Sequence, residues 1–240
     1  MGFLNRIGLG NARATGTSGP AALRAHVPTT ATALAGPSFA PRETRGSNSL
    51  KDFLWHLNGI GRGNLLDLGP VWQSTVSFFI ERGFKVSTED VLTGWKQFSQ
   101  EETERQRSLP EDQERVSRAE LGKVFLETSL QYAPGSFDAV LAWDVLDYLE
   151  DDTMKLVAER LRSLVREGGV ILAMFHSKRP QQFQRYRILD EKTLEMVPSS
   201  SIFPMARVFQ NREISDLFTR FHTSKTYLGR DQLREGLFVK

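Results

Sequence analysis

The stretch that decides the fold is Leu65–Asp90, LLDLGPVWQSTVSFFIERGFKVSTED. Its apolar start predicts a buried strand, which Asp67 and Gly69 end. Apolar residues then recur at helical spacing, and Gly83 is a typical helix stop. A second strand closes on the carboxylate of Asp90. The order strand, tight turn, helix and strand is typical of the first half of a nucleotide-binding α/β domain, in which a carboxylate so placed accepts hydrogen bonds from ribose hydroxyls.

A second block, Leu130–Asp151, reads LQYAPGSFDAVLAWDVLDYLED. It predicts a loop, a buried strand over Phe137–Trp143 and a turn that carries Asp144. A glycine turn and the apolar strand Val170–Phe175 come later, after an amphipathic helix whose apolar face holds Met154, Val157, Leu161 and Leu164. This order predicts the second half of the same fold.

Together the two blocks resemble class I S-adenosylmethionine-dependent methyltransferases, whose first motif is an acidic residue, a spacer and Gly-x-Gly-x-Gly. Asp67 and Gly69 match the acid and the first glycine. The ribose-binding acid of that family lies about twenty residues past this glycine, where Asp90 stands. The resemblance implies a single α/β domain with a Rossmann-like, doubly wound, mostly parallel sheet and an antiparallel terminal strand pair.

The chain departs from the family where the second and third glycines are expected, because Val71 and Gln73 stand there. A β-branched residue in a left-handed conformation costs on the order of 1–2 kcal/mol, so Val71 predicts a different turn shape. Pro70 removes an amide donor and favours extended geometry at Gly69. The turn either holds the cofactor through a shifted loop or has lost it, and the sequence leaves both readings open.

The resemblance implies S-adenosyl-L-methionine as the cofactor and assigns cofactor-binding roles to Asp67, Gly69, Asp90, Glu127 and Asp144. Asp90 is expected at the ribose, and Asp67 and Gly69 are expected to frame the methionine part. Glu127 is expected near the adenine amino group. Asp144 is expected to line the cleft together with the residue that follows it in the sequence. A turn-forming role fits Asp144 equally well.

No residue is assigned as catalytic, because methyl transfer from a sulfonium relies largely on positioning and on the exclusion of water. Tyr148 and His176 are acid–base candidates beside the cleft, and Glu89 is an alternative ribose ligand to Asp90. The sequence has no cysteine, which excludes covalent methylation at the C5 position of pyrimidines. The turn after Asp144 also lacks the Asn/Asp-Pro-Pro-Tyr pattern of amino-group methylation on bases and glutamine.

The expected activity is therefore methyl transfer to an unidentified acceptor: a small molecule, a lipid or a protein side chain. The altered glycine turn favours an alternative, a catalytically inactive scaffold or binding protein that kept the fold. A dehydrogenase on a related sheet is a weaker alternative, because the chain lacks Gly-x-Gly-x-x-Gly as well.

Composition supports one domain, 47–240, behind a basic disordered tail, 1–46. Residues 1–50 hold five arginines and one glutamate, which gives this segment a charge of +4 within a chain of net charge +2. The domain itself thus gives no electrostatic argument for nucleic acid. No apolar run approaches the roughly 20 residues of a membrane span, and the scattered histidines predict no metal site. We expect a cytoplasmic protein, although the tail also fits an organellar transit peptide.

Further elements are expected around the two blocks. Ser49 is expected to cap a helix that Asn58-Gly59 stops. A hairpin after the fifth strand is expected to shape the acceptor pocket, because insertions at the carboxyl ends of strands lie over the crevice. The remaining predictions are a third strand over Lys123–Leu126, the hairpin strands Arg185–Leu189 and Thr193–Val197, a helix from Asn211, and a terminal pair over Thr223–Leu228 and Leu233–Val239.

Overall fold

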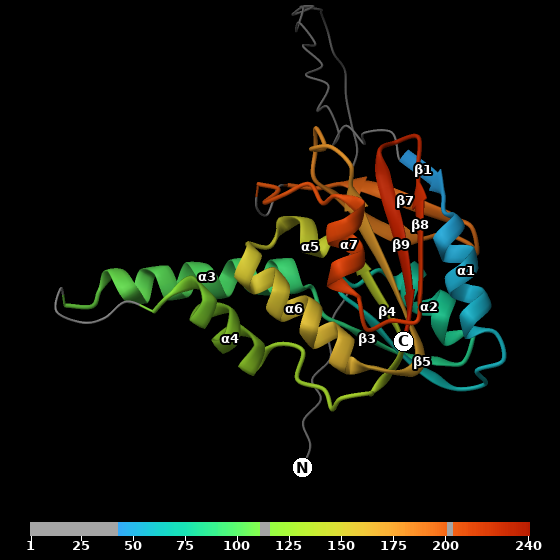
Figure 1. Ribbon diagram of the computed structural model, residues 1–240, viewed down its shortest axis with the longest axis horizontal. Coiled ribbons are helices and arrows are strands. Elements are labelled where there is room, and N and C mark those ends of the chain that lie inside the picture. The colour runs from blue at the N-terminus through green and yellow to red at the C-terminus, as the bar shows by residue number, and fades with distance from the viewer. Residues whose placement is uncertain (1–42, 111–115, 201–203) are drawn as a thin grey trace, which may run out of the picture. The chain divides into compact units, whose positions relative to one another are not determined.

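The computed structural model describes residues 43–110, 116–200 and 204–240 (Figure 1). Within these residues the main sheet has six strands in the order β3-β2-β4-β5-β9-β8. The first four of these strands run parallel, whereas β9 lies antiparallel to both β5 and β8. Their bounds are β2 Gly63–Asp67, β3 Phe84–Thr88, β4 Phe137–Trp143, β5 Val165–His176, β8 Thr223–Leu228 and β9 Leu233–Val239. The predicted doubly wound α/β fold with an antiparallel terminal pair is confirmed.

Each face of this sheet carries its own apolar core, because successive side chains of a strand point to opposite faces. In β4, Leu141 and Trp143 join one core while Val140 and Ala142 join the other. The Leu141 side is covered by α1 (Asn48–Leu57), α2 (Gln73–Ile80) and a second, smaller sheet. The other side is covered by α3 Val91–Arg107, α4 Arg118–Thr128, α5 Val145–Tyr148, α6 Asp151–Leu164 and α7 Asn211–Leu217.

The second sheet is antiparallel, with the order β1-β7-β6. The predicted hairpin is confirmed and supplies β6 (Gln184–Ile188) and β7 (Thr193–Pro198). Its third strand, β1 (Glu43–Gly46), is formed by the last residues of the predicted tail. The rest of that tail, residues 1–42, lies outside the described residues, so its disorder stays a prediction.

The predicted third strand is wrong, because Lys123–Leu126 lie in the middle of α4. The Ser117 hydroxyl accepts from the Glu120 backbone N–H, and the Glu120 carboxylate accepts from the Ser117 backbone, so a capping box starts the helix. Phe125 then buries its ring against Trp95 of α3. The four-residue window has the apolar content of a strand but forms one turn of a helix, in which Phe125 is buried and Val124 is 42% exposed.

The predicted helix cap at Ser49 is also wrong, by two residues. Ser47 is the N-cap, because its side-chain oxygen accepts from the Leu50 backbone N–H at 3.0 Å. The Ser49 hydroxyl instead donates to the buried Glu235 carboxylate of β9 at 2.6 Å. The predicted end at Asn58-Gly59 is correct, since Asn58 is the C-cap and Gly59 takes φ +90°.

Candidate functional site

The predicted site lies at the carboxyl ends of the parallel strands. Asp67 is the last residue of β2, and the backbone N–H of Glu89, one residue past β3, donates to its carbonyl at 2.8 Å. Asp144 follows β4 directly, and His176 ends β5. Parallel strands bring their carboxyl ends to one edge, so the structure gathers these positions in the predicted order.

Asp67 is fully buried and is bound by groups of this chain. Its Oδ1 accepts from the Gly69 backbone N–H at 3.0 Å and from the Trp143 indole Nε1 at 2.6 Å. Its Oδ2 has no hydrogen-bond partner among the described residues. Burial raises the pKa of the Asp67 carboxyl to about 6, although both hydrogen bonds oppose that shift.

The space against the glycine turn is taken by the indole of Trp143. A Cβ placed on Gly69 would lie 3.0 Å from Trp143 Nε1 and 3.1 Å from its Cδ1. The indole also stacks on the ring of Tyr186 from β6, with centroids 5.7 Å apart and planes at 14°. Both aromatic side chains are buried, whereas Val71 in the turn is 71% exposed.

Asp90 is paired with an arginine of the small sheet. It is the N-cap of α3 and accepts from the Thr93 backbone N–H at 3.2 Å and hydroxyl at 2.7 Å. Its two carboxylate oxygens also accept from Arg185 at 3.2 and 3.0 Å. The neighbouring Glu89 is engaged as well, since its carboxylate accepts from the Leu130 backbone N–H at 2.7 Å.

Glu127 lies on α4 with its side chain exposed, near the C-terminal end of that helix. Glu127 therefore lies on a helix, whereas the sequence placed it just after a third strand. Its contact with an adenine amino group stays a prediction.

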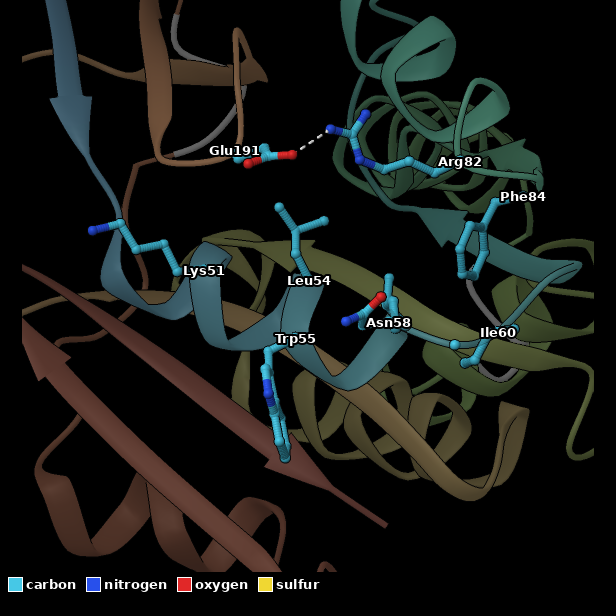
Figure 2. A pocket seen from close by; sticks show the side chains of 10 residues that line it. Lys51, Leu54, Trp55, Asn58, Ile60, Arg82, Phe84 and Glu191 are labelled. Carbon is cyan, nitrogen blue, oxygen red and sulfur yellow. Dashed lines mark hydrogen bonds and ion pairs between the residues drawn. The ribbon is translucent and has the colours of Figure 1, made fainter.

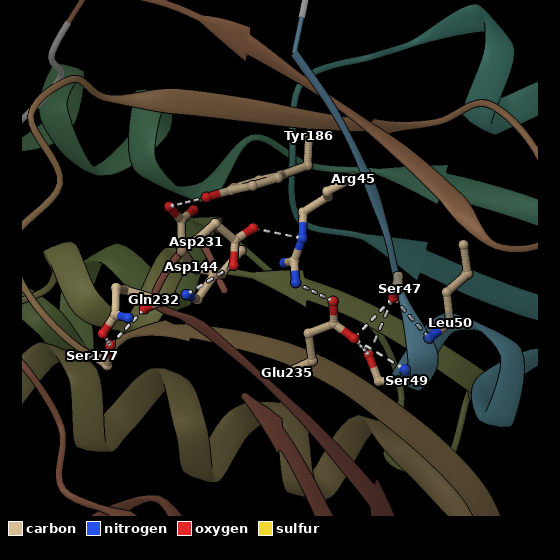
Figure 3. Close-up of polar contacts among 11 residues, drawn as sticks. Arg45, Ser47, Ser49, Leu50, Asp144, Ser177, Tyr186, Asp231, Gln232 and Glu235 are labelled. Carbon is tan, nitrogen blue, oxygen red and sulfur yellow. Dashed lines mark hydrogen bonds and ion pairs between the residues drawn. The ribbon is translucent and has the colours of Figure 1, made fainter. Parts of the chain in front are cut away.

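Asp144 belongs to a buried polar cluster below the small sheet. The Tyr186 hydroxyl donates to Asp144 Oδ2 at 3.2 Å (Figure 3), and His176 Nδ1 lies 3.8 Å from the same oxygen. His176 also contacts Asp147, whose Oδ2 lies 2.9 Å from Nδ1 and accepts from the His176 backbone N–H at 2.7 Å. Tyr148, the other acid–base candidate, packs edge-on against the imidazole of His176, with ring centroids 6.3 Å apart.

Burial dominates the proton affinities in this cluster. It raises the pKa of Asp144 to about 7 and also raises that of Asp147. Burial alone would lower the pKa of His176, but the hydrogen bond with Asp147 and the charge of Asp144 outweigh it, so this pKa is raised. Burial likewise raises the pKa of the Tyr148 hydroxyl, which has no hydrogen-bond partner within the described part of the chain. Tyr148 is thus a poor proton donor or base near neutral pH.

Three residues that contact the predicted site were not identified from the sequence: Trp143, Arg185 and Tyr186. A bulky residue at the end of β4, next to the predicted cleft residue Asp144, was a usable signal for Trp143. No local signal marked Arg185, because it meets Asp90 across 95 residues of sequence.

Groups of this chain lie at the positions where the resemblance places S-adenosyl-L-methionine. The Trp143 indole lies against Gly69, where the methionine part is expected, and Arg185 pairs with the Asp90 carboxylate expected at the ribose. A further hydrogen bond joins the small sheet to α2: the Ile188 backbone N–H donates to the buried Thr75 hydroxyl at 3.0 Å.

Two negative findings concern the ranges 43–110, 116–200 and 204–240. They contain no helix long and apolar enough to cross a membrane. They also contain no group of three or more His, Asp or Glu side chains arranged to hold a metal ion.

Comparisons with solved structures return methyltransferases. A Burkholderia thailandensis 1,6-didemethyltoxoflavin-N1-methyltransferase, solved with that compound and S-adenosylhomocysteine, is 16% identical, with 80% of this chain and 78% of that chain covered and a TM-score of 0.43. The N-methyltransferase NodS of Bradyrhizobium japonicum WM9, solved with S-adenosyl-L-homocysteine, is 13% identical over 80% and 85% of the two chains, with a TM-score of 0.39. An S-adenosylmethionine-dependent methyltransferase of Mesorhizobium loti is 14% identical over 79% and 96%, with a TM-score of 0.41.

No protein-family model matches the chain, and no curated protein matches it either. The strand order of the main sheet nevertheless confirms the predicted class I methyltransferase fold. The confirmation concerns the fold alone.

Proposed function

We propose that this chain is a catalytically inactive scaffold or binding protein built on the class I methyltransferase fold, with its cofactor crevice closed by its own side chains. One observation carries the proposal: the carboxylates expected at the methionine part and at the ribose of the cofactor are both engaged inside the chain. Asp67 accepts from Trp143, and Asp90 accepts from Arg185. This is the alternative that the altered glycine turn favoured.

Opening the crevice is costly. A ligand at Gly69 would have to displace the stacked rings of Trp143 and Tyr186, which are 4% and 2% exposed. Exposing one buried aromatic side chain costs on the order of 3 kcal/mol. An opening cost of about 3 kcal/mol, for one ring alone, would lower an apparent affinity roughly 150-fold. The closed arrangement is therefore expected to weaken cofactor binding strongly.

Calorimetric titration with S-adenosylmethionine and S-adenosylhomocysteine tests the proposal. We expect no saturable heat with the wild-type chain at millimolar ligand. A Trp143→Gly/Arg185→Ala variant removes both blocking side chains and is the variant in which binding is expected to gain most. Trp55→Gly is a matched control, because Trp55 is 70% exposed on α1, outside the crevice.

A second candidate function is S-adenosylmethionine-dependent methyl transfer to a small molecule, a lipid or a protein side chain. Asp67, Gly69 and Asp90 support it, because they lie in the family's order at the same strand edge, and Asp67 Oδ2 has no hydrogen-bond partner among the described residues. In this candidate the β6–β7 hairpin moves away before the cofactor binds. Saturable heat with the wild-type chain that is lost in Asp90→Ala would reject the first candidate and support this one.

A further inference from the structure

A cavity of about 460 Å³ lies apart from the crevice (Figure 2). Ile60 precedes β2 and Phe84 begins β3, so the cavity adjoins the amino ends of these strands, whereas the crevice lies at their carboxyl ends. Its apolar lining comes from α1 and these strand starts: Leu54, Leu57, Ile60 and Phe84. Its volume lies within the range of about 300–1,000 Å³ that is usual for small-molecule sites.

The rim of the cavity carries a preorganised arginine. The Arg82 guanidinium lies 3.6 Å over the Phe78 ring and donates to the Phe78 carbonyl at 2.9 Å. It also donates to Glu191, in the β6–β7 turn, at 2.9 Å. In Figure 2, Leu54 points from α1 toward this ion pair. Lys51 adds a second positive charge to the lining.

The Arg82–Glu191 pair is easily exchanged. The Glu191 side chain is 74% exposed and that of Arg82 is 33% exposed. An exposed ion pair of this kind contributes about 0–1 kcal/mol, so another carboxylate replaces Glu191 at little cost. The Phe78 contacts keep the guanidinium in place during that exchange, which favours a planar, two-point acceptor.

We propose that this cavity binds a small apolar carboxylate, with its hydrocarbon part on Leu54, Ile60 and Phe84 and its carboxylate on Arg82 in place of Glu191. The two rim cations against one acid, above an apolar floor, favour an anion with a hydrophobic body over an amine or a sugar. This site goes beyond the proposed function, because neither its residues nor its ligand class depend on the closed crevice.

Titration of the full chain with 1-naphthoate tests the proposal, with 1-naphthylmethanol and 1-naphthylmethylamine as neutral and cationic analogues. We expect saturable binding of the carboxylate, with the alcohol weaker by about threefold because it lacks the charge that Arg82 recognises. Arg82→Gln should weaken 1-naphthoate by about threefold and leave the alcohol unchanged. Arg62→Gln is the matched control, since this exposed arginine does not line the cavity and should change neither.

Glu191→Gln is the decisive variant. Because it removes the negative charge that competes for Arg82, it should tighten 1-naphthoate by about threefold. Lys51→Gln, an exposed helix position that should not disturb folding, should weaken it by about threefold. The proposal is overturned if 1-naphthoate does not saturate at millimolar concentration, if Glu191→Gln fails to tighten it, or if the amine binds more tightly than the carboxylate. None of these results depends on S-adenosylmethionine.

Discussion

Trp143, whose indole lies against Gly69 and binds Asp67, has a strained backbone. It has φ +45°, a left-handed conformation that costs an L-residue on the order of 1–2 kcal/mol. The hydrogen bond from its indole to Asp67 and the stacking on Tyr186 offset that cost. A strained residue of this kind, held by buried partners, is consistent with a fixed internal contact.

The buried carboxyl of Asp67 predicts a pH dependence of stability. Its pKa is raised from 3.8 to about 6, so between these values the folded chain keeps a proton that the unfolded chain releases. Stability from this group is therefore present below about pH 4 and is lost as the pH rises through about 6. Asp67→Asn keeps an acceptor for Gly69 and Trp143 but does not titrate.

Urea unfolding of Asp67→Asn and the wild-type chain at pH 4.5 and pH 7 measures this effect. The variant should gain stability relative to the wild type as the pH rises, by on the order of 1–3 kcal/mol. Asp144 and Asp147 are present in both chains, so their titration largely cancels in the difference. A stability difference that does not change with pH would contradict the raised pKa of Asp67.

At the scale of elements, β3 is an edge strand of the main sheet, and α3 and α4 follow it in the chain where a third strand was predicted. Aromatic contacts join the two helices. The ring centroid of Phe125 in α4 lies 5.3 Å from that of Trp95 and 5.7 Å from that of Phe98, both in α3. The start of α3 is also where the small sheet is fastened, through Asp90 and Arg185 of β6. This ion pair thus joins α3, which packs on the main sheet, to β6 of the small sheet.

Arg185→Ala is expected to loosen that joint. The pair is bidentate and its side chains are only 11% and 23% exposed, so we expect a loss of about 1–2 kcal/mol in the free energy of unfolding. Urea denaturation measures it. Arg107→Ala, which removes a pair 3.9 Å long between side chains 75% and 80% exposed, is the matched control and should leave stability unchanged. Equal effects of the two variants would argue against a structural ion pair at Asp90.

At the scale of the whole domain, β1 is fixed to the main sheet by a buried charge network (Figure 3). Arg45 of β1 pairs with Asp231, in the β8–β9 turn, and with Glu235 of β9, both at 2.8 Å. The Glu235 carboxylate also accepts from the hydroxyls of Ser47 and Ser49 at 3.0 and 2.6 Å. Ion pairs therefore join both edge strands of the small sheet to the rest of the domain, through Arg45 on β1 and Arg185 on β6.

Arg45→Ala should destabilise the domain by about 3–4 kcal/mol, because it leaves the buried carboxylate of Glu235 without its counter-ion. The double variant Arg45→Ala/Glu235→Gln should recover part of that loss, since it removes the uncompensated charge. Denaturation reports the energies, and hydrogen exchange should show the β1–β7 amides losing most protection. A double variant no more stable than Arg45→Ala would argue that the charge of Glu235 is not the cause.

The sequence by itself predicted most of the architecture. The bounds of β4, β8 and β9 are those predicted, because an apolar run or alternation flanked by turn residues is a local property of the chain. It also predicted that Asp67 and Asp90 meet at one strand edge, since parallel strands bring their carboxyl ends together. It failed at Lys123–Leu126, where a short apolar window fits a helix face and a strand equally well.

Only the tertiary structure decided whether that strand edge is open. Trp143 reaches Asp67 across 76 residues and Arg185 reaches Asp90 across 95. No local pattern contains such a pair, because the occupant of a space depends on which side chains distant segments deliver to it. Periodicity determines where a strand ends, whereas the packing of the small sheet determined what fills the space beyond it.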